Sequence, residues 1–165
     1  MATLAPNPKI TPYLWFAEKA VEAAELYVSL FPDSRMVSVS PLAADSPSGP
    51  AGSVRTLEFV LGGQRFLAIE AGPLDPFNRA VSFLVDCEDQ AEVDRYWSAL
   101  TAGGGQEGRC GWLQDRYGVH WQIVPKALGA LMQRADPARA RRVMEAMLGM
   151  NKLDVAGLEK AARGG

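Results

Sequence analysis

The sequence predicts an α+β fold made of two βαβββ modules followed by a C-terminal helical extension. Three observations predict it: a strand–turn–strand unit at 110–125, an order of strand, helix and strands that occurs twice within about the first 125 residues, and helical patterns alone afterwards. A repeat this long, with little identity between its halves, indicates a duplicated module. The modules are expected at about 9–74 and 78–125 of a domain spanning 1–125, with the extension at 126–165.

In the first module, alternating and β-branched patterns predict four strands, at Lys9–Phe16, Arg35–Ser40, Ser53–Leu61 and Gln64–Ala71. Apolar residues recur at three- and four-residue steps over Glu18–Phe31, which predicts a helix. Pro12 restricts the first strand to a sheet edge or a bulge. Gly62-Gly63 is a two-residue hairpin signal, and Pro41–Gly52 is rich in Pro and Gly and is expected to be a loop.

The second module begins with a predicted strand at Arg79–Asp86 and a helix that Asp89 caps and that runs through Leu100. A glycine-rich turn at Gly103–Gly108 precedes a hairpin, whose arms are expected at Cys110–Leu113 and Val119–Val124. Asp115 has turn chemistry, because its carboxylate can bond the backbone two residues on.

Alternation in the second arm of this hairpin separates polar from apolar side chains. His120, Gln122 and Val124 share one face, and Val119, Trp121 and Ile123 share the other. A fully apolar face beside a face with two polar side chains predicts a strand that lies between a packed core and a cavity.

The extension contains two helices with clear start signals. Asp136-Pro137 begins a helix that runs to Met150, and Asp154 caps a last short helix. Such an amphipathic arm is expected to pack on its own sheet or on a partner subunit, with its methionines as core or interface filler.

Composition excludes several classes of protein. The chain has 165 residues, 48% of them apolar, and 17 basic against 19 acidic side chains without a basic run, so nucleic acid is not an expected partner. No apolar run approaches a membrane span, and the N-terminal residues lack the pattern of a signal peptide, so a cytoplasmic location is expected. Cys87 and Cys110 show no metal-binding spacing and are interpreted as buried free thiols.

Four segments, LYVSLFPDS, LGGQRFLAIEAGP, CEDQAEVDRYWSAL and CGWLQDRYGVHWQIVP, together with the repeated βαβββ order, resemble the PhnB-like group of the vicinal oxygen chelate superfamily. Members of this group are often labelled 3-demethylubiquinone-9 3-methyltransferase. The resemblance implies a glyoxalase/bleomycin-resistance/dioxygenase fold, in which a pair of half-barrels encloses a cavity, and a homodimer.

In metal-dependent relatives, four inward side chains hold a divalent cation. By resemblance, those places fall near Pro12, at Glu70, near Ala80 and at Gln122. Proline and alanine cannot ligate through their side chains, and glutamine is a weak neutral ligand. No catalytic metal or other cofactor is therefore expected, with a divalent metal held by Glu70, His120 and Gln122 as the alternative.

Glu70 is an acid in an otherwise apolar strand, so it is a candidate general base or anchor for a substrate donor. The alternative for Glu70 is a hydrogen bond to a neighbouring strand or a salt bridge at the strand end. The expected ligand-binding residues are the aromatic and polar side chains predicted to line the cavity: Tyr13, Trp15, Phe66, Glu70, Trp112, His120 and Gln122. Core packing is the alternative for the aromatic residues, and a hydrogen-bonded pair on the sheet face is the alternative for His120 and Gln122.

The leading hypothesis is a protein that binds a small, partly apolar molecule in a cavity between modules. The first alternative is a metal-dependent lyase, isomerase or dioxygenase that acts on vicinal oxygens, and the second is an interaction protein that works through its tail. Methyltransferase activity is not expected. Gly103–Gly108 matches GxGxxG, but it follows a helix and precedes a strand, the reverse of a nucleotide-binding turn.

Overall fold

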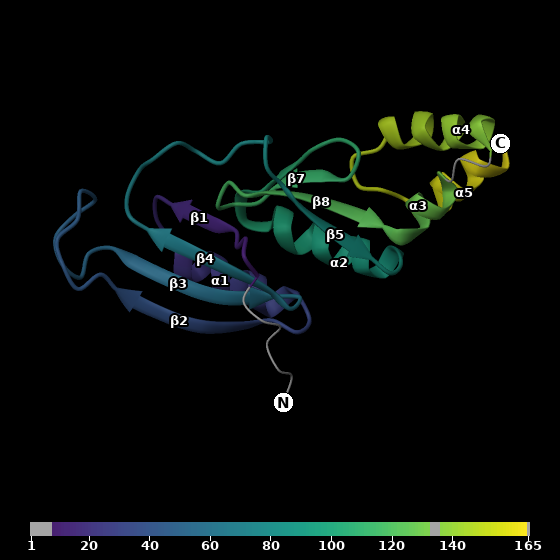
Figure 1. Cartoon of the computed structure of the whole chain (residues 1–165). Helices are drawn as coiled ribbons and strands as arrows, with labels where there is room; N and C mark the ends of the chain where they lie inside the picture. Colours follow the sequence, from purple (N-terminus) through teal and green to yellow (C-terminus); the bar gives the residue numbers. More distant parts are fainter. Residues whose placement is uncertain (1–7, 133–135, 165) are drawn as a thin grey trace. The chain divides into compact units, whose positions relative to one another are not determined.

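The computed structural model describes residues 8–132 and 136–164 (Figure 1). The chain divides into two compact units at the boundary between Pro76 and Phe77, and each unit contains one βαβββ module. Most of the N-terminal stretch that lacks a signal-peptide pattern lies outside the described residues. None of the helices in the described part is long and apolar enough to cross a membrane.

The first unit forms a four-stranded sheet in the order β1-β4-β3-β2. Its elements follow the prediction to within a few residues: β1 (Tyr13–Phe16), α1 (Ala20–Leu30), β2 (Arg35–Pro41), β3 (Arg55–Leu61) and β4 (Gln64–Glu70). β1 pairs parallel with β4, and the other neighbours are antiparallel. β1 is an edge strand, as Pro12 beside it predicts.

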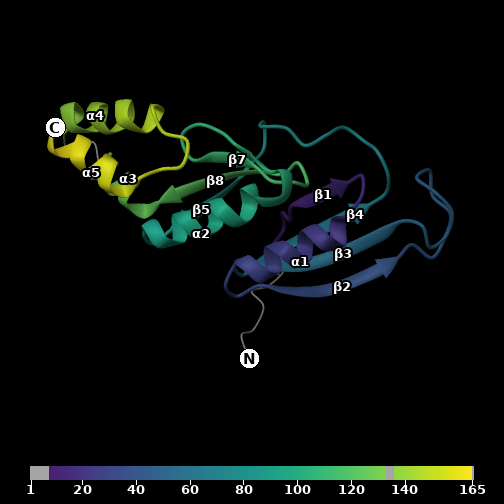
Figure 2. The same ribbon diagram turned by 180° about the vertical axis from the view of Figure 1, so that it is seen from behind.

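Helix α1 covers one face of this sheet, behind it in Figure 1 and in front of it in Figure 2. Its small buried residues, among them Ala20 and Ala24, allow close packing on β3 and β4. Under the helix, the rings of Phe59 and Phe66 stack with centroids 5.4 Å apart. The opposite face of the sheet carries no helix of its own unit and is called here the open face.

The second unit repeats this arrangement with a sheet in the order β5-β8-β7-β6. Its elements are β5 (Phe83–Cys87), α2 (Gln90–Thr101), the short 3-10 turn η1 (Ala102–Gly104), β6 (Gln106–Glu107), β7 (Trp112–Gln114) and β8 (His120–Pro125). Asp89 caps α2 as predicted, since its Oδ1 accepts the N–H of Glu92 at 2.9 Å. β5 begins four residues later than expected, and the two-residue strand β6 was not predicted.

Helix α2 buries one side, including Val93, Tyr96 and Trp97, toward the sheet of the second unit. The β8 residues Trp121 and Ile123 are 3% and 0% exposed. The predicted alternation is therefore confirmed: Trp121 and Ile123 belong to the core, and the polar side chains of β8 lie on the open face.

The extension forms three helices, α3 (Lys126–Leu131), α4 (Pro137–Leu148) and α5 (Val155–Arg163), of which α3 was not predicted. The carboxylates of Asp136 and Asp154 cap α4 and α5 as expected. The segment between α4 and α5 is bonded to the start of α2 in the same unit. Gln90 at the start of α2 donates to the carbonyl of Leu153 at 3.1 Å and accepts the N–H of Val155 at 2.8 Å.

The two cysteines differ in environment. Cys87 is fully buried, and burial is the main cause that raises the pKa of its thiol to about 12. Cys110 is only partly buried, so the prediction of two buried thiols is wrong for Cys110. The reason is that Cys110 lies in a tight turn with φ of 58°, outside the core.

Asp115 holds the turn between β7 and β8. Its carboxylate is 3% exposed and accepts the N–H groups of Tyr117 at 2.9 Å and Val119 at 3.0 Å, and the indole N–H of Trp121 at 2.8 Å. A buried carboxylate is tolerated only when donors replace its hydration, as they do here. The turn role predicted for Asp115 is confirmed.

Replacing Asp115 should strongly destabilise the second unit. Asp115→Ala removes an acceptor from three donors, so we expect the free energy of unfolding to fall by about 3 kcal/mol or more. Urea unfolding followed by tryptophan fluorescence measures the loss. Asp86→Ala, at an exposed aspartate of β5, is the control and should have little effect; equal losses in the two variants would contradict this role of Asp115.

Candidate functional site

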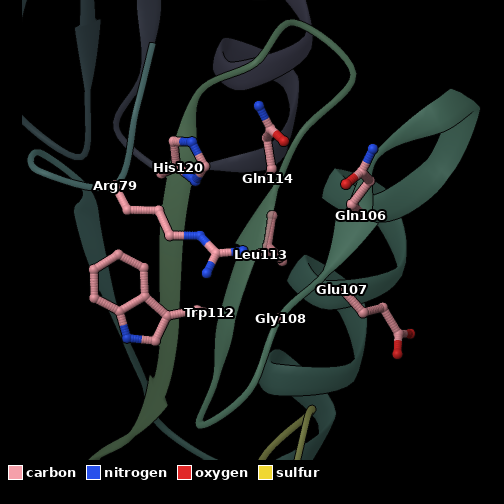
Figure 3. A pocket seen from close by; sticks show the side chains of 8 residues that line it. All are labelled: Arg79, Gln106, Glu107, Gly108, Trp112, Leu113, Gln114 and His120. Carbon is pink, nitrogen blue, oxygen red and sulfur yellow. The ribbon is translucent and has the colours of Figure 1, made fainter.

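The open face of the second sheet is hollowed beside Trp112. An open depression of about 260 Å³ is lined by Arg79, Gly108, Arg109 and Trp112. A smaller pocket of about 30 Å³ adjoins it, shares Arg79, Gly108 and Trp112, and reaches His120 (Figure 3). We call the two together the Trp112 hollow. Its larger part lies near the lower end of the range for ligand pockets, about 300–1,000 Å³.

The two polar side chains of β8 fasten the segment 77–82 over the open face. The imidazole of His120 forms a hydrogen bond with the backbone of Phe77. Nε2 of Gln122 donates to Oγ of Ser82 at 2.9 Å. Between these points the carboxamide oxygen of Asn78 accepts the N–H of Ala80 at 2.8 Å. The backbone that carries Arg79 is therefore held on both sides.

Figure 3 shows the Arg79 side chain running between the indole of Trp112 and the imidazole of His120. His120 is 7% exposed. Burial lowers its pKa, and the charge of Arg79 lowers the pKa further, while Asp115 and the hydrogen bond to the backbone of Phe77 act in the opposite direction. His120 is consequently a neutral imidazole at pH 7, able both to donate and to accept a hydrogen bond.

Trp112 differs from the other three tryptophans in its hydrogen bonding. The indole N–H groups of Trp15, Trp97 and Trp121 donate to the carbonyl of Gly72, to Glu107 and to Asp115 at 2.8–3.1 Å. Trp112 is half-buried, and its N–H finds no acceptor among the residues that the structure describes. An indole of this kind offers a ligand both an apolar surface and a donor.

Arg109 reaches the hollow from the tight turn between β6 and β7. The carbonyl of Arg109 accepts the N–H of Trp112 at 3.1 Å, and the N–H of Gly108 donates to the carbonyl of Trp112 at 2.8 Å. The extension holds the other side of the turn. The carbonyls of Met150 and Asn151 accept the N–H groups of Cys110 and Gly111, both at 2.8 Å.

Of the predicted site residues in the first unit, Glu70 has a clear structural role. Its Oε2 accepts the N–H of Ala20, the first residue of α1, at 2.8 Å. The N-cap residue Lys19 has a left-handed backbone, φ 63°, and supplies no side-chain cap. Glu70 therefore satisfies a helix N-terminus that would otherwise lack a side-chain acceptor. Its role as a catalytic base stays a prediction.

The remaining predicted residues divide between core and open face. Phe66 is 6% exposed and stacks on Phe59 beneath α1, so its packing is that of a core residue. Tyr13 and Trp15 lie on the open face of the first sheet, because they alternate with the buried Leu14 and Phe16 of β1. In the second unit, Trp112 and His120 line one hollow, and Gln122 lies on the same face.

Sequence reasoning missed the two arginines of the hollow and its two amides, Gln106 and Gln114. Exposed arginines in turns have no periodic signal. The one available signal was the sequence Asn-Arg-Ala before β5. Asn favours turns, so it indicates that the arginine after it lies in a turn.

Comparisons with known proteins identify the family and agree with the fold. The model of the family described as 3-demethylubiquinone-9 3-methyltransferase matches residues 8–124. The chain belongs to this family. A search of curated proteins found no match.

Among solved structures, the chain is similar to the PhnB protein from Bacillus cereus, described as a 3-demethylubiquinone-9 3-methyltransferase. The identity is 35% and the TM-score 0.64, with 72% of this chain and 99% of that chain covered. Protein PA1353 from Pseudomonas aeruginosa (24%, TM-score 0.54, 72% and 97% covered) and the fosfomycin resistance protein FosX from Listeria monocytogenes (14%, 0.53, 77% and 98%) share the fold. The predicted vicinal oxygen chelate fold is confirmed.

The residues near the places that the resemblance gives for metal ligands are poor ligands for a divalent cation. Pro12 and Ala80 have no ligating side chain, one carboxylate oxygen of Glu70 accepts a helix N–H, and Gln122, whose Nε2 donates to Ser82, offers only a neutral amide oxygen. The alternative set of Glu70, His120 and Gln122 contains one carboxylate, and that carboxylate is already engaged. In residues 8–132 and 136–164, no three His, Cys, Asp or Glu side chains are grouped as a metal would need.

We expect Glu70 to act on stability through α1. Glu70→Ala should lower the free energy of unfolding by about 1 kcal/mol, the order of losing a helix N-terminal acceptor. Glu70→Gln keeps an acceptor oxygen and should therefore retain most of the stability that Glu70→Ala loses. Urea unfolding of both variants measures the change in the free energy of unfolding. Unchanged stability in Glu70→Ala would contradict the role of this carboxylate at the start of α1.

The lowered pKa of His120 makes stability depend on pH. Below about 6.5, the ordinary histidine pKa, the unfolded chain binds a proton that the folded imidazole resists, so stability should fall as the pH drops from 7 toward 5. His120→Gln removes this contribution. Its melting temperature, compared with the wild type across this range, should depend less steeply on pH, and parallel curves would contradict the assignment.

Proposed function

We propose that this family member binds a small, partly apolar molecule in the Trp112 hollow and has no resident catalytic metal. The observation that carries the proposal is the half-buried Trp112 indole, whose N–H has no acceptor in the described part of the chain and which forms a wall of the hollow. A flat ligand stacked on this ring would gain apolar burial and one hydrogen bond.

The polar groups around the indole support this proposal. The neutral His120 imidazole and the Gln114 amide line the inner pocket beside Trp112. They supply a few placed donors and acceptors on an apolar wall, which is the usual composition of a small-molecule site. The homodimer implied by the superfamily resemblance and a cytoplasmic location belong to the same proposal.

Binding without a methyl donor is favoured by the arrangement of the glycine-rich segment. Gly103 has φ of 68° and lies in η1, directly after α2 and before β6. An S-adenosyl donor needs the opposite order, a glycine turn between a strand and a helix N-terminus. The family's descriptive name therefore does not fit the chemistry that we propose.

Binding in the hollow should be visible in the tryptophan and histidine signals. The chain has four tryptophans and one histidine, so each indole N–H and the one imidazole give resolvable NMR resonances. Titration with small aromatic fragments should shift the signals of Trp112 and His120 and leave that of Trp121, which is buried on the core face of β8 and bonded to Asp115, unchanged.

Trp112→Ala should abolish fragment binding, because both the apolar wall and the donor are lost. Tyr117→Ala, at a half-buried aromatic of the same unit that does not line the hollow, is the control. Fragments that bind Trp112→Ala as well as the wild type, or that shift only residues of the extension, would contradict this function.

A further inference from the structure

Two cations flank the Trp112 hollow without a carboxylate partner. Neither Arg79 nor Arg109 forms an ion pair among the residues that the structure describes, and both line the larger depression. Other arginines of the same unit do pair, such as Arg95 with Glu92 and Arg141 with Glu145. Arg139 and Arg142 donate to backbone carbonyls instead, whereas Arg79 and Arg109 have neither kind of side-chain partner among the described residues.

The one carboxylate in the lining is already committed. Oε1 of Glu107 accepts the indole N–H of Trp97 at 2.9 Å, and Figure 3 shows the Glu107 side chain directed away from the Arg79 guanidinium. The charge of Arg79 is also felt at His120, whose pKa it lowers. The lining therefore carries two guanidinium charges against one carboxylate, a net positive formal charge, although the whole chain carries a formal charge of −2.

Both arginines stand on fixed backbone. Arg79 lies in the segment that His120 and Gln122 fasten to β8, and Arg109 lies in the turn held by the extension. Gly111 in that turn has φ of +82°, and a Cβ there would come within 2.8 Å of the Ile123 carbonyl, so the turn is tightly defined. Fixed anchor points reduce the ordering cost of binding.

We propose that the Trp112 hollow selects anions, with a carboxylate or phosphate head group held between Arg79 and Arg109 and the apolar body of the same molecule against the Trp112 indole. The inference rests on the proposed function and specifies its ligand class. Guanidinium groups bind such oxyanions through charge-assisted hydrogen bonds. The Trp112 indole N–H, which has no acceptor among the described residues, adds a further donor to the lining.

A pair of isosteric probes tests the charge preference. 2-Naphthoate and its neutral amide, 2-naphthamide, are titrated into the full chain, with the Trp112 indole and His120 imidazole resonances as readouts. Naphthoate should bind at least about tenfold more tightly, the order of one charge-assisted hydrogen bond. Bound naphthoate should also raise the pKa of His120 by offsetting Arg79, whereas naphthamide should not.

Single substitutions then identify the arginines that cause the preference for naphthoate over naphthamide. Arg79→Gln and Arg109→Gln should each reduce the preference for naphthoate to a few-fold, while Arg116→Gln, at an arginine that does not line the hollow, should preserve it. Equal affinity for both probes in the wild type would overturn anion selection and leave the proposed function standing. Failure of both probes to shift Trp112 would overturn both. An equal loss in Arg116→Gln would overturn the assignment to Arg79 and Arg109.

Discussion

The buried carboxylate of Asp115 is the constraint on which the second unit depends. By accepting two backbone N–H groups and the Trp121 indole, it fixes the register between β7 and β8. A slip of one residue would exchange the faces of β8 and place His120 in the core and Trp121 in solvent. The same three bonds therefore determine which side chains of β8 lie on the open face beside the hollow.

The two modules satisfy the N-terminus of their first helix in different ways. In the second module, Asp89 supplies a local cap within the sequence that enters α2. In the first module, Lys19 at the equivalent place has no suitable oxygen, and Glu70 provides it from the end of β4, fifty residues on. This difference explains an acid in an apolar strand without invoking catalysis, and it shows how duplicated modules diverge while keeping the same hydrogen-bond requirements.

The sequence predicted the order of elements well because hydrophobic period and turn residues are local signals. It did not predict α3, which follows β8 directly and begins without a side-chain cap, or β6, which has two residues. Alternation correctly separated the faces of β4 and β8. It gave no information on which face a helix covers, so it did not decide whether Phe66 lines a cavity or packs in the core beneath α1. Arg79 and Arg109 escaped notice because their positions are set by hydrogen bonds to β8 and to the extension, which are contacts distant in sequence.

The turn that carries Arg109 depends on two carbonyls of the extension, those of Met150 and Asn151. These residues lie beyond 8–124, the part of the chain that the family model matches. One side of the hollow is thus shaped by a segment outside the matched residues. Under the proposed function, changes in the extension would alter the ligand preference while every strand of the βαβββ modules is left intact.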